Sequence, residues 1–173
     1  MQTRSPIVIA MMLLSLTFAN SASTAVEQGR GPSTPEERAR VVKIAHLLEA
    51  NPLSKELKAE REWALRWLIE VPDISITLCS KLPDVSALGK YKYRGELIVQ
   101  STLSQAAFVI ENPDMAKDLA AASLAGMESV LRSYKAILNE NPKATSKYLD
   151  EMLDKRNREE LAGFVKELAA GCK

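Results

Sequence analysis

Residues 97–110 read LIVQSTLSQAAFVI, a run of 14 residues without a charged side chain. Helices at the surface of globular proteins carry charged and polar residues on their outer face. A helical run without any charge is therefore expected to have other helices around most of it. We predict that this run forms the most enclosed helix of the domain. The following Glu111-Asn112-Pro113 should end it, because the residue before a proline is pushed away from helical angles.

Apolar residues recur at helical spacing on both sides of this run, and capping residues or prolines mark where most of the repeats begin and end. We therefore predict an all-α fold, a compact array of roughly six helices with helical-hairpin character. Besides the central run, the expected helices are 34–51 capped by Thr34, 54–71 capped by Ser54, 114–140 capped by Asp114, a shorter one around 148–153, and a last one opened by Asn157 and Glu160.

Residues 74–82 have two interpretations. Their apolar side chains alternate as in a strand, but the apolar residues at every fourth position also fit one face of a helix. Because no second strand candidate lies nearby, the favoured interpretation is a short helix capped by Asp73. Residues 83–93 are then expected to form a connecting loop.

Residues 1–25 have the pattern of a secretory signal peptide. Arg4 gives a positive start, a short apolar run follows, and Ser23 and Ala25 are small residues placed for cleavage. A cut before Ala22 would also fit this pattern of small residues at the cleavage site. The alternative is a membrane anchor, but a spanning helix needs about 20 apolar residues, and this run is shorter. We predict a cleaved signal and a secreted or periplasmic protein.

Cleavage after Ala25 leaves 148 of the 173 residues, which is the size of one domain. We expect a flexible leader at 26–33, a single helical domain at 34–173, and no membrane span after cleavage. Arg4 is the only charge removed, so 22 basic and 22 acidic residues remain. Nucleic-acid-binding proteins are usually strongly basic, and no nucleic-acid partner is expected.

Cys79 and Cys172 are the two cysteines of the chain. In an exported protein they are expected to form one intrachain disulfide that ties the array together. The apolar stripe of the last helix, Leu161, Val165 and Leu168, continues to Cys172 and directs it inwards. The bridge would close a loop of about 90 residues, for which the chain-entropy model gives roughly 4–5 kcal/mol. Two free thiols or an intermolecular bridge are the alternatives.

Catalytic and metal-binding motifs are missing from the sequence. His46 is the only histidine, and no motif marks a serine or cysteine nucleophile beside it. HExxH, CxxC, EF-hand and glycine-rich phosphate motifs do not occur. We predict no catalytic residue, no metal site and no cofactor, and the sequence favours a protein that is not an enzyme.

Two pairs of aromatic residues are candidate binding residues. Trp63 and Trp67 lie one helical turn apart, near arginines, and would form an aromatic surface if they were exposed. At this spacing a place in the core is favoured. Tyr91 and Tyr93 belong to the sequence KYKYR and could recognise an anionic surface. The favoured interpretation is a solvated loop whose tyrosines cover the core.

A set of polar residues on the enclosed helix forms the third candidate. Gln100, Ser104 and Gln105, with Ser101 and Thr102, lie in the run that we expect to be buried. Buried amides and hydroxyls need hydrogen-bond partners. Neighbouring helices would provide these partners in the favoured interpretation. In the other interpretation the side chains line a polar pocket that accepts a ligand.

Two functional hypotheses follow. The favoured one is a non-catalytic helical domain outside the cytoplasm that binds a protein or peptide partner, or is associated with the cell envelope. The alternative is a small secreted hydrolase or lyase with a site around His46. The enzyme would need His46 at the edge of a concave pocket with a carboxylate in hydrogen-bond reach. The binding module would need an exposed apolar or aromatic patch instead.

Overall fold

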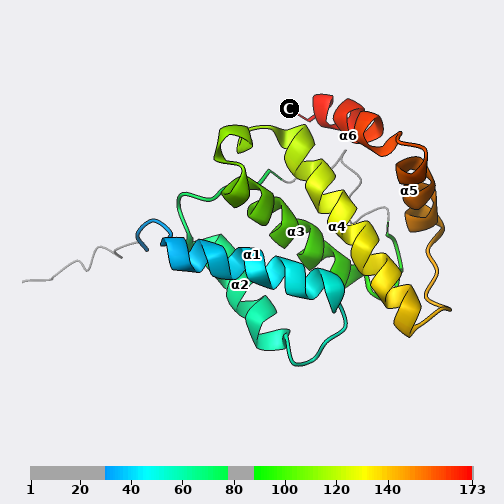
Figure 1. Ribbon diagram of the computed structural model, residues 1–173, viewed down its shortest axis with the longest axis horizontal. Helices are drawn as coiled ribbons and strands as arrows, with labels where there is room; N and C mark the ends of the chain where they lie inside the picture. The colour runs from blue at the N-terminus through cyan, green and yellow to red at the C-terminus, as the bar shows by residue number, and fades with distance from the viewer. Residues whose placement is uncertain (1–29, 78–87, 173) are drawn as a thin grey trace, which may run out of the picture.

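The computed structural model describes residues 30–77 and 88–172 (Figure 1). This part of the chain is all-α, as the sequence predicts, and contains six α-helices, one short 3₁₀ helix and no strand. The elements are α1 (Pro35–Ala50), α2 (Lys58–Glu70), α3 (Arg94–Glu111), η1 (Pro113–Met115), α4 (Leu119–Glu140), α5 (Lys147–Asn157) and α6 (Leu161–Ala170).

Helix α3 lies at the centre of the described part (Figure 1). It packs along α4, and it also contacts α1 and α2. From Glu96 to Ile110 no residue of α3 is exposed, which is the longest run of this kind in the described helices. The enclosed position predicted for residues 97–110 is therefore confirmed.

Helix α4 buries two faces. The predicted apolar stripe, which includes Met127, Leu131 and Tyr134, joins a core cluster with side chains of α5 and α6. The sequence did not indicate the second face, which is made of small side chains and lies towards α3 and α1. This second face contains Ser123, Gly126, Ser129 and Ser133, all of them buried.

The three Asn-Pro pairs end helices as predicted. Asn51, Asn112 and Asn141 are the C-terminal capping positions of α1, α3 and α4, and each backbone N–H still donates to the carbonyl four residues earlier. The Nδ2 atoms of Asn51 and Asn112 donate to the carbonyl oxygens of Leu47 and Phe108, at 3.1 and 2.9 Å. These two carbonyls thus accept two hydrogen bonds each, one from the backbone and one from the side chain of the same asparagine.

Helix starts were predicted less well. The capping box of Thr34 and Glu37 is present in α1. Ser54 is not the cap of α2, because a turn at residues 55–57 precedes the helix. The Ser54 hydroxyl accepts a 3.4 Å hydrogen bond from Leu57 N and donates to Glu56 Oε2 at 2.8 Å, within that turn. Leu57 occupies the capping position without a side-chain bond.

Asp114 is also not the cap that we expected. It lies in η1, and α4 begins only at Leu119, after Asp118, whose carboxylate accepts from Ala121 N at 3.0 Å. The chain must reverse direction between α3 and α4, and η1 with the bend after it provides this reversal. The long helix therefore starts one turn later than predicted.

The predicted short helix capped by Asp73 is wrong in the part that can be described. Residues 71–77 have no regular secondary structure, and 78–82 lie outside the described residues. The Asp73 carboxylate accepts hydrogen bonds from Ser33 N and Ser33 Oγ, both at 2.8 Å, and from Arg38 Nη2 at 2.6 Å. The Ser33 backbone N–H is the main reason that the pKa of Asp73 falls to about 2. These donors occupy the carboxylate, which therefore does not cap a helix.

Asn157 is the last residue of α5 and does not open α6. Glu159 follows with a φ of 61°, in the left-handed region, and α6 begins at Leu161 without a side-chain cap at Glu160. The polar run before Leu161 therefore forms a tight connection between α5 and α6, and α6 starts a few residues later than predicted.

Several predictions concern residues outside the described part. Residues 1–29 contain the predicted signal peptide and half of the leader, and residues 78–87 contain Cys79. Signal cleavage and the Cys79–Cys172 disulfide therefore stay predictions. Cys172 itself is half-buried against the core cluster of α4, α5 and α6. Among the described helices, none combines the length and the apolar character that crossing a membrane requires.

Candidate functional site

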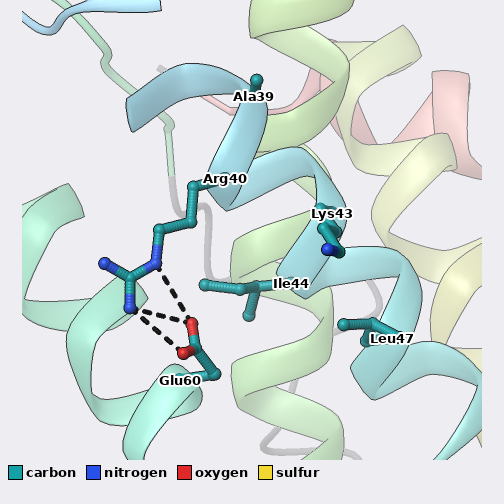
Figure 2. Close-up of a pocket in the computed structure, with 6 residues that line it drawn as sticks. All are labelled: Ala39, Arg40, Lys43, Ile44, Leu47 and Glu60. Carbon is teal, nitrogen blue, oxygen red and sulfur yellow. Dashed lines mark hydrogen bonds and ion pairs between the residues drawn. The ribbon is translucent and has the colours of Figure 1, made fainter. Parts of the chain in front are cut away.

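A groove between α1 and α2 is the candidate site. It has a volume of about 520 Å³ and is open to solvent. Helix α1 contributes five of its lining residues, and Glu60 of α2 is on the opposite side (Figure 2). We call it the α1–α2 groove, and its lining residues are Ala39, Arg40, Lys43, Ile44, Leu47 and Glu60.

Arg40 and Glu60 join the two helices at one side of the groove (Figure 2). Arg40 Nε lies 3.2 Å from Glu60 Oε2, and Arg40 Nη2 lies 3.1 and 3.0 Å from the two carboxylate oxygens. The guanidinium carbon is also 3.8 Å from the centre of the Trp63 ring. Paired arginine and carboxylate groups hold each other in a fixed plane, and stacking on an aromatic ring adds to this. This side of the groove is therefore ordered before any ligand binds.

The remaining lining combines an apolar base with one unpaired cation. Ile44 is buried, and Leu47 is 38% exposed, which is high for a leucine in this structure. Lys43 is exposed, and within the described residues it has no ion pair or hydrogen bond. Because Lys43 and Leu47 are four residues apart on α1, they lie next to each other on the same face.

The two tryptophans do not form an open aromatic surface. Trp67 is only 2% exposed and belongs to the core cluster of α1, α2 and α3, in agreement with the favoured interpretation. Trp63 is partly buried and stacks on Trp67, with ring centres 6.3 Å apart. Because Arg40 covers the Trp63 ring, Trp63 supports the groove from the side and does not line it.

Gln100, Ser104 and Ser129 form a buried polar network between helices. Gln100 Nε2 lies 2.9 Å from the Ala45 carbonyl oxygen, 2.9 Å from Ser104 Oγ and 2.8 Å from Ser129 Oγ. Ser104 Oγ donates to Ser129 Oγ at 2.7 Å. Of the predicted polar set, Gln100 and Ser104 are thus satisfied mainly by α1 and α4, as the favoured interpretation required.

The network continues to the surface through Glu49 of α1. Ser129 Oγ donates to Glu49 Oε2 at 2.5 Å, and Arg132 donates to both carboxylate oxygens, at 2.7 and 3.0 Å. Burial raises the pKa of Glu49, but the hydrogen bonds from Arg132 and Ser129 outweigh burial and hold the pKa below its usual value. Glu49 therefore joins α1 to α4 as a charged carboxylate.

Gln105 lies where α3 and α4 approach most closely. Its Nε2 is 3.4 Å from Ser101 Oγ, and its Oε1 is buried without a hydrogen-bond partner among the described residues, as is Ser123 Oγ. A Cβ atom added to Gly126 would lie 2.9 Å from Gln105 Cγ. The helices are in close contact at this point, and Gln105 does not reach the α1–α2 groove.

Tyr91 and Tyr93 fasten the loop before α3 to the far end of α4. The Tyr91 hydroxyl donates to the Ala144 carbonyl at 3.0 Å, and the Tyr93 hydroxyl accepts from Asn141 Nδ2 at 3.1 Å. The Tyr91 ring packs edge to face against Tyr93 and Tyr134, and burial is the main cause that raises its pKa. These contacts agree with the favoured interpretation, in which the tyrosines cover the core.

His46 lies on the exposed face of α1. Its side chain is 64% exposed, and Nε2 is 3.8 Å from Glu111 Oε1, a distance longer than a hydrogen bond. His46 does not line the α1–α2 groove. Within residues 30–77 and 88–172, no three histidine, cysteine or acidic side chains are grouped so that they could hold a metal ion.

Comparisons of the chain with protein-family models, with curated proteins and with solved structures found no match. The properties of the site are therefore argued from its own residues.

None of the lining residues of the groove was a sequence-predicted candidate. One signal could have indicated Leu47: it is followed directly by Leu48, and adjacent residues on a helix point about 100° apart. Leu48 is buried in the core, and Leu47, which points in a different direction, is therefore less easily buried. The Arg40–Glu60 pair gave no signal, because its members are 20 residues apart.

Proposed function

We propose that this protein is a non-catalytic helical domain that acts outside the cytoplasm and binds a protein or peptide partner in the α1–α2 groove. The observation that carries the proposal is a groove of about 520 Å³ in which Leu47, 38% exposed, lies beside Lys43, which has no ion pair within the described residues. An apolar base with a few polar groups at its edge is the usual composition of a binding site.

The order of the groove before binding supports this proposal. Arg40 is held by Glu60 and by the Trp63 ring, so it loses little freedom when a partner arrives. Affinity depends on such preorganisation more than on buried area, since the ordering of side chains opposes association. A partner that covers Leu47 would also remove apolar surface from water, at about 25 cal/mol for each Å².

The cellular location and the disulfide belong to the same proposal. The signal-like residues 1–25 support export, and export supports oxidation of Cys79 and Cys172. Cys172 follows the buried stripe of α6 and is half-buried against the core cluster of α4, α5 and α6. This position is compatible with a bridge to the segment after α2. In this proposal the disulfide is structural and lies apart from the binding groove.

Photo-cross-linking at defined positions tests the site. A photoreactive amino acid is placed at Leu47 in one variant and at Ile69 in a matched control. Each variant is then mixed with the exported fraction of the source cells and irradiated. Ile69 is an apolar residue of α2 that is 84% exposed and does not line the groove. A discrete adduct at position 47 that is missing at position 69 supports the proposal. Equal adducts at both positions, or none at 47, would show that the groove is not the binding site.

A further inference from the structure

The charges around the α1–α2 groove are unequal, and the excess is positive. Arg40, Lys43 and Glu60 are its charged lining residues. Glu60 is neutralised by Arg40, with contacts of 3.0 to 3.2 Å. Lys43 has no such partner within the described residues, so the lining carries a net charge of about +1, beside Leu47.

Some hydrogen-bond donors on this side of the groove are also unused. The contacts of Arg40 with Glu60 use Nε and Nη2, and within the described residues Nη1 donates no hydrogen bond. Arg40 turns towards Glu60 and α2, whereas Lys43 lies on the other side of Ile44 (Figure 2). An acceptor group beside Leu47 could therefore receive a hydrogen bond from Lys43 Nζ.

We propose that the occupant of the groove is an acidic peptide segment of a partner protein, in which an aliphatic side chain lies close to a carboxylate. The aliphatic side chain covers Leu47, and the carboxylate accepts a hydrogen bond from Lys43. This inference rests on the proposed binding function and specifies its ligand. It follows from the charge complementarity and from the position of Leu47 one turn beyond Lys43.

The neighbouring groups argue against other classes of ligand. A basic segment would place a cation next to Lys43, where like charges repel. A phosphate monoester or an anionic membrane surface would bring more than one negative charge to a lining whose net charge is about +1. A single carboxylate with an apolar neighbour matches one unpaired cation beside one exposed leucine.

Peptide selection provides the test. A phage-displayed library of random dodecapeptides is selected on the immobilised chain, and peptides that also bind a Leu47→Asp variant are removed. We expect the selected sequences to have an aliphatic residue within about four positions of Asp or Glu. One selected peptide is then synthesised with a fluorescent label, and its binding is measured by anisotropy.

The variants give quantitative expectations. Exposed ion pairs contribute about 0.2–1 kcal/mol, so Lys43→Gln should weaken binding roughly 1.4- to fivefold. Lys135→Gln is the matched control, because Lys135 is an exposed lysine of α4 outside the groove, and it should leave binding unchanged. Binding to the original chain should also weaken as salt is raised, because salt screens exposed charges.

The possible results separate this inference from the proposed function. Peptides that depend on Leu47 but are neutral or basic would overturn the inference and leave the groove as a binding site. Equal effects of Lys43→Gln and Lys135→Gln would likewise overturn the inference alone. A selection that yields no Leu47-dependent peptide overturns both. Co-sedimentation with phosphatidylglycerol vesicles that is lost in Lys43→Gln would also overturn the inference, because it would assign Lys43 to a lipid surface.

Discussion

Replacement of Gly126 by alanine tests the packing of the two central helices. Gly126 lies in the middle of α4, where an added Cβ would lie 2.9 Å from Gln105 Cγ, 3.0 Å from Ser101 Oγ and 3.1 Å from the Ser101 carbonyl oxygen. The last of these is a backbone atom, so a rotamer change alone does not relieve the contact. The α3 backbone would have to move away from α4.

Two opposing effects determine the magnitude. Alanine is favoured over glycine inside a helix by about 1 kcal/mol, whereas extra volume in a well-packed core costs about 1–3 kcal/mol. The net result for Gly126→Ala is a loss of about 0–2 kcal/mol in the free energy of unfolding. Gly163 of α6 is the matched control, since an added Cβ there would meet no atom within 4 Å. Gly163→Ala should therefore gain about 0.5–1 kcal/mol.

Urea and thermal unfolding of the two variants measure this difference. For a domain of about 150 residues, 1 kcal/mol corresponds to roughly 2–4 °C in Tm. We expect Gly163→Ala to melt slightly above the original protein, and Gly126→Ala to melt at least a few degrees below Gly163→Ala. If the two variants are stabilised equally, α3 and α4 do not approach each other as described, and the reasoning about their contact is refuted.

Two other predictions concern stability. Glu49→Gln removes the charged pairing with Arg132 and should lower the free energy of unfolding by about 1–2 kcal/mol at pH 7. The pKa of Glu49 is lowered in the folded protein, so the stability that its charge contributes is present above the ordinary pKa of 4.5 and is lost as the pH falls through the folded value. Urea unfolding should therefore show a smaller effect of the substitution at pH 3 than at pH 7. Equal effects at the two pH values would contradict this role of the charge. Cys172→Ser should lower Tm, and hydrogen exchange should show α6 opening first; non-reducing mass spectrometry of exported protein that finds two alkylatable thiols would mean that Cys79 and Cys172 are not bridged.

Local signals in the sequence predicted much of the fold. The Thr34–Glu37 capping box and the Asn-Pro helix ends were correct, because these effects depend on residues within one helical turn. The predicted start of α4 at Asp114 was wrong, because η1 and a turn precede Asp118, which caps the helix. The return of α4 along α3 is a contact between separate helices, which local signals do not give.

The candidate site shows the same division between local and tertiary information. A helical pattern assigns Leu48 to the core, where it is buried, but it does not state what lies beside its neighbour Leu47. That depends on how α2 crosses α1, which places Glu60 next to Arg40 and so leaves Lys43 as the cation without a partner in the described part. An exposed leucine alone is common on protein surfaces and carries no functional meaning. Its position beside the Arg40–Glu60 pair, and beside a lysine without an ion pair in the described part, is the basis of the proposed binding site.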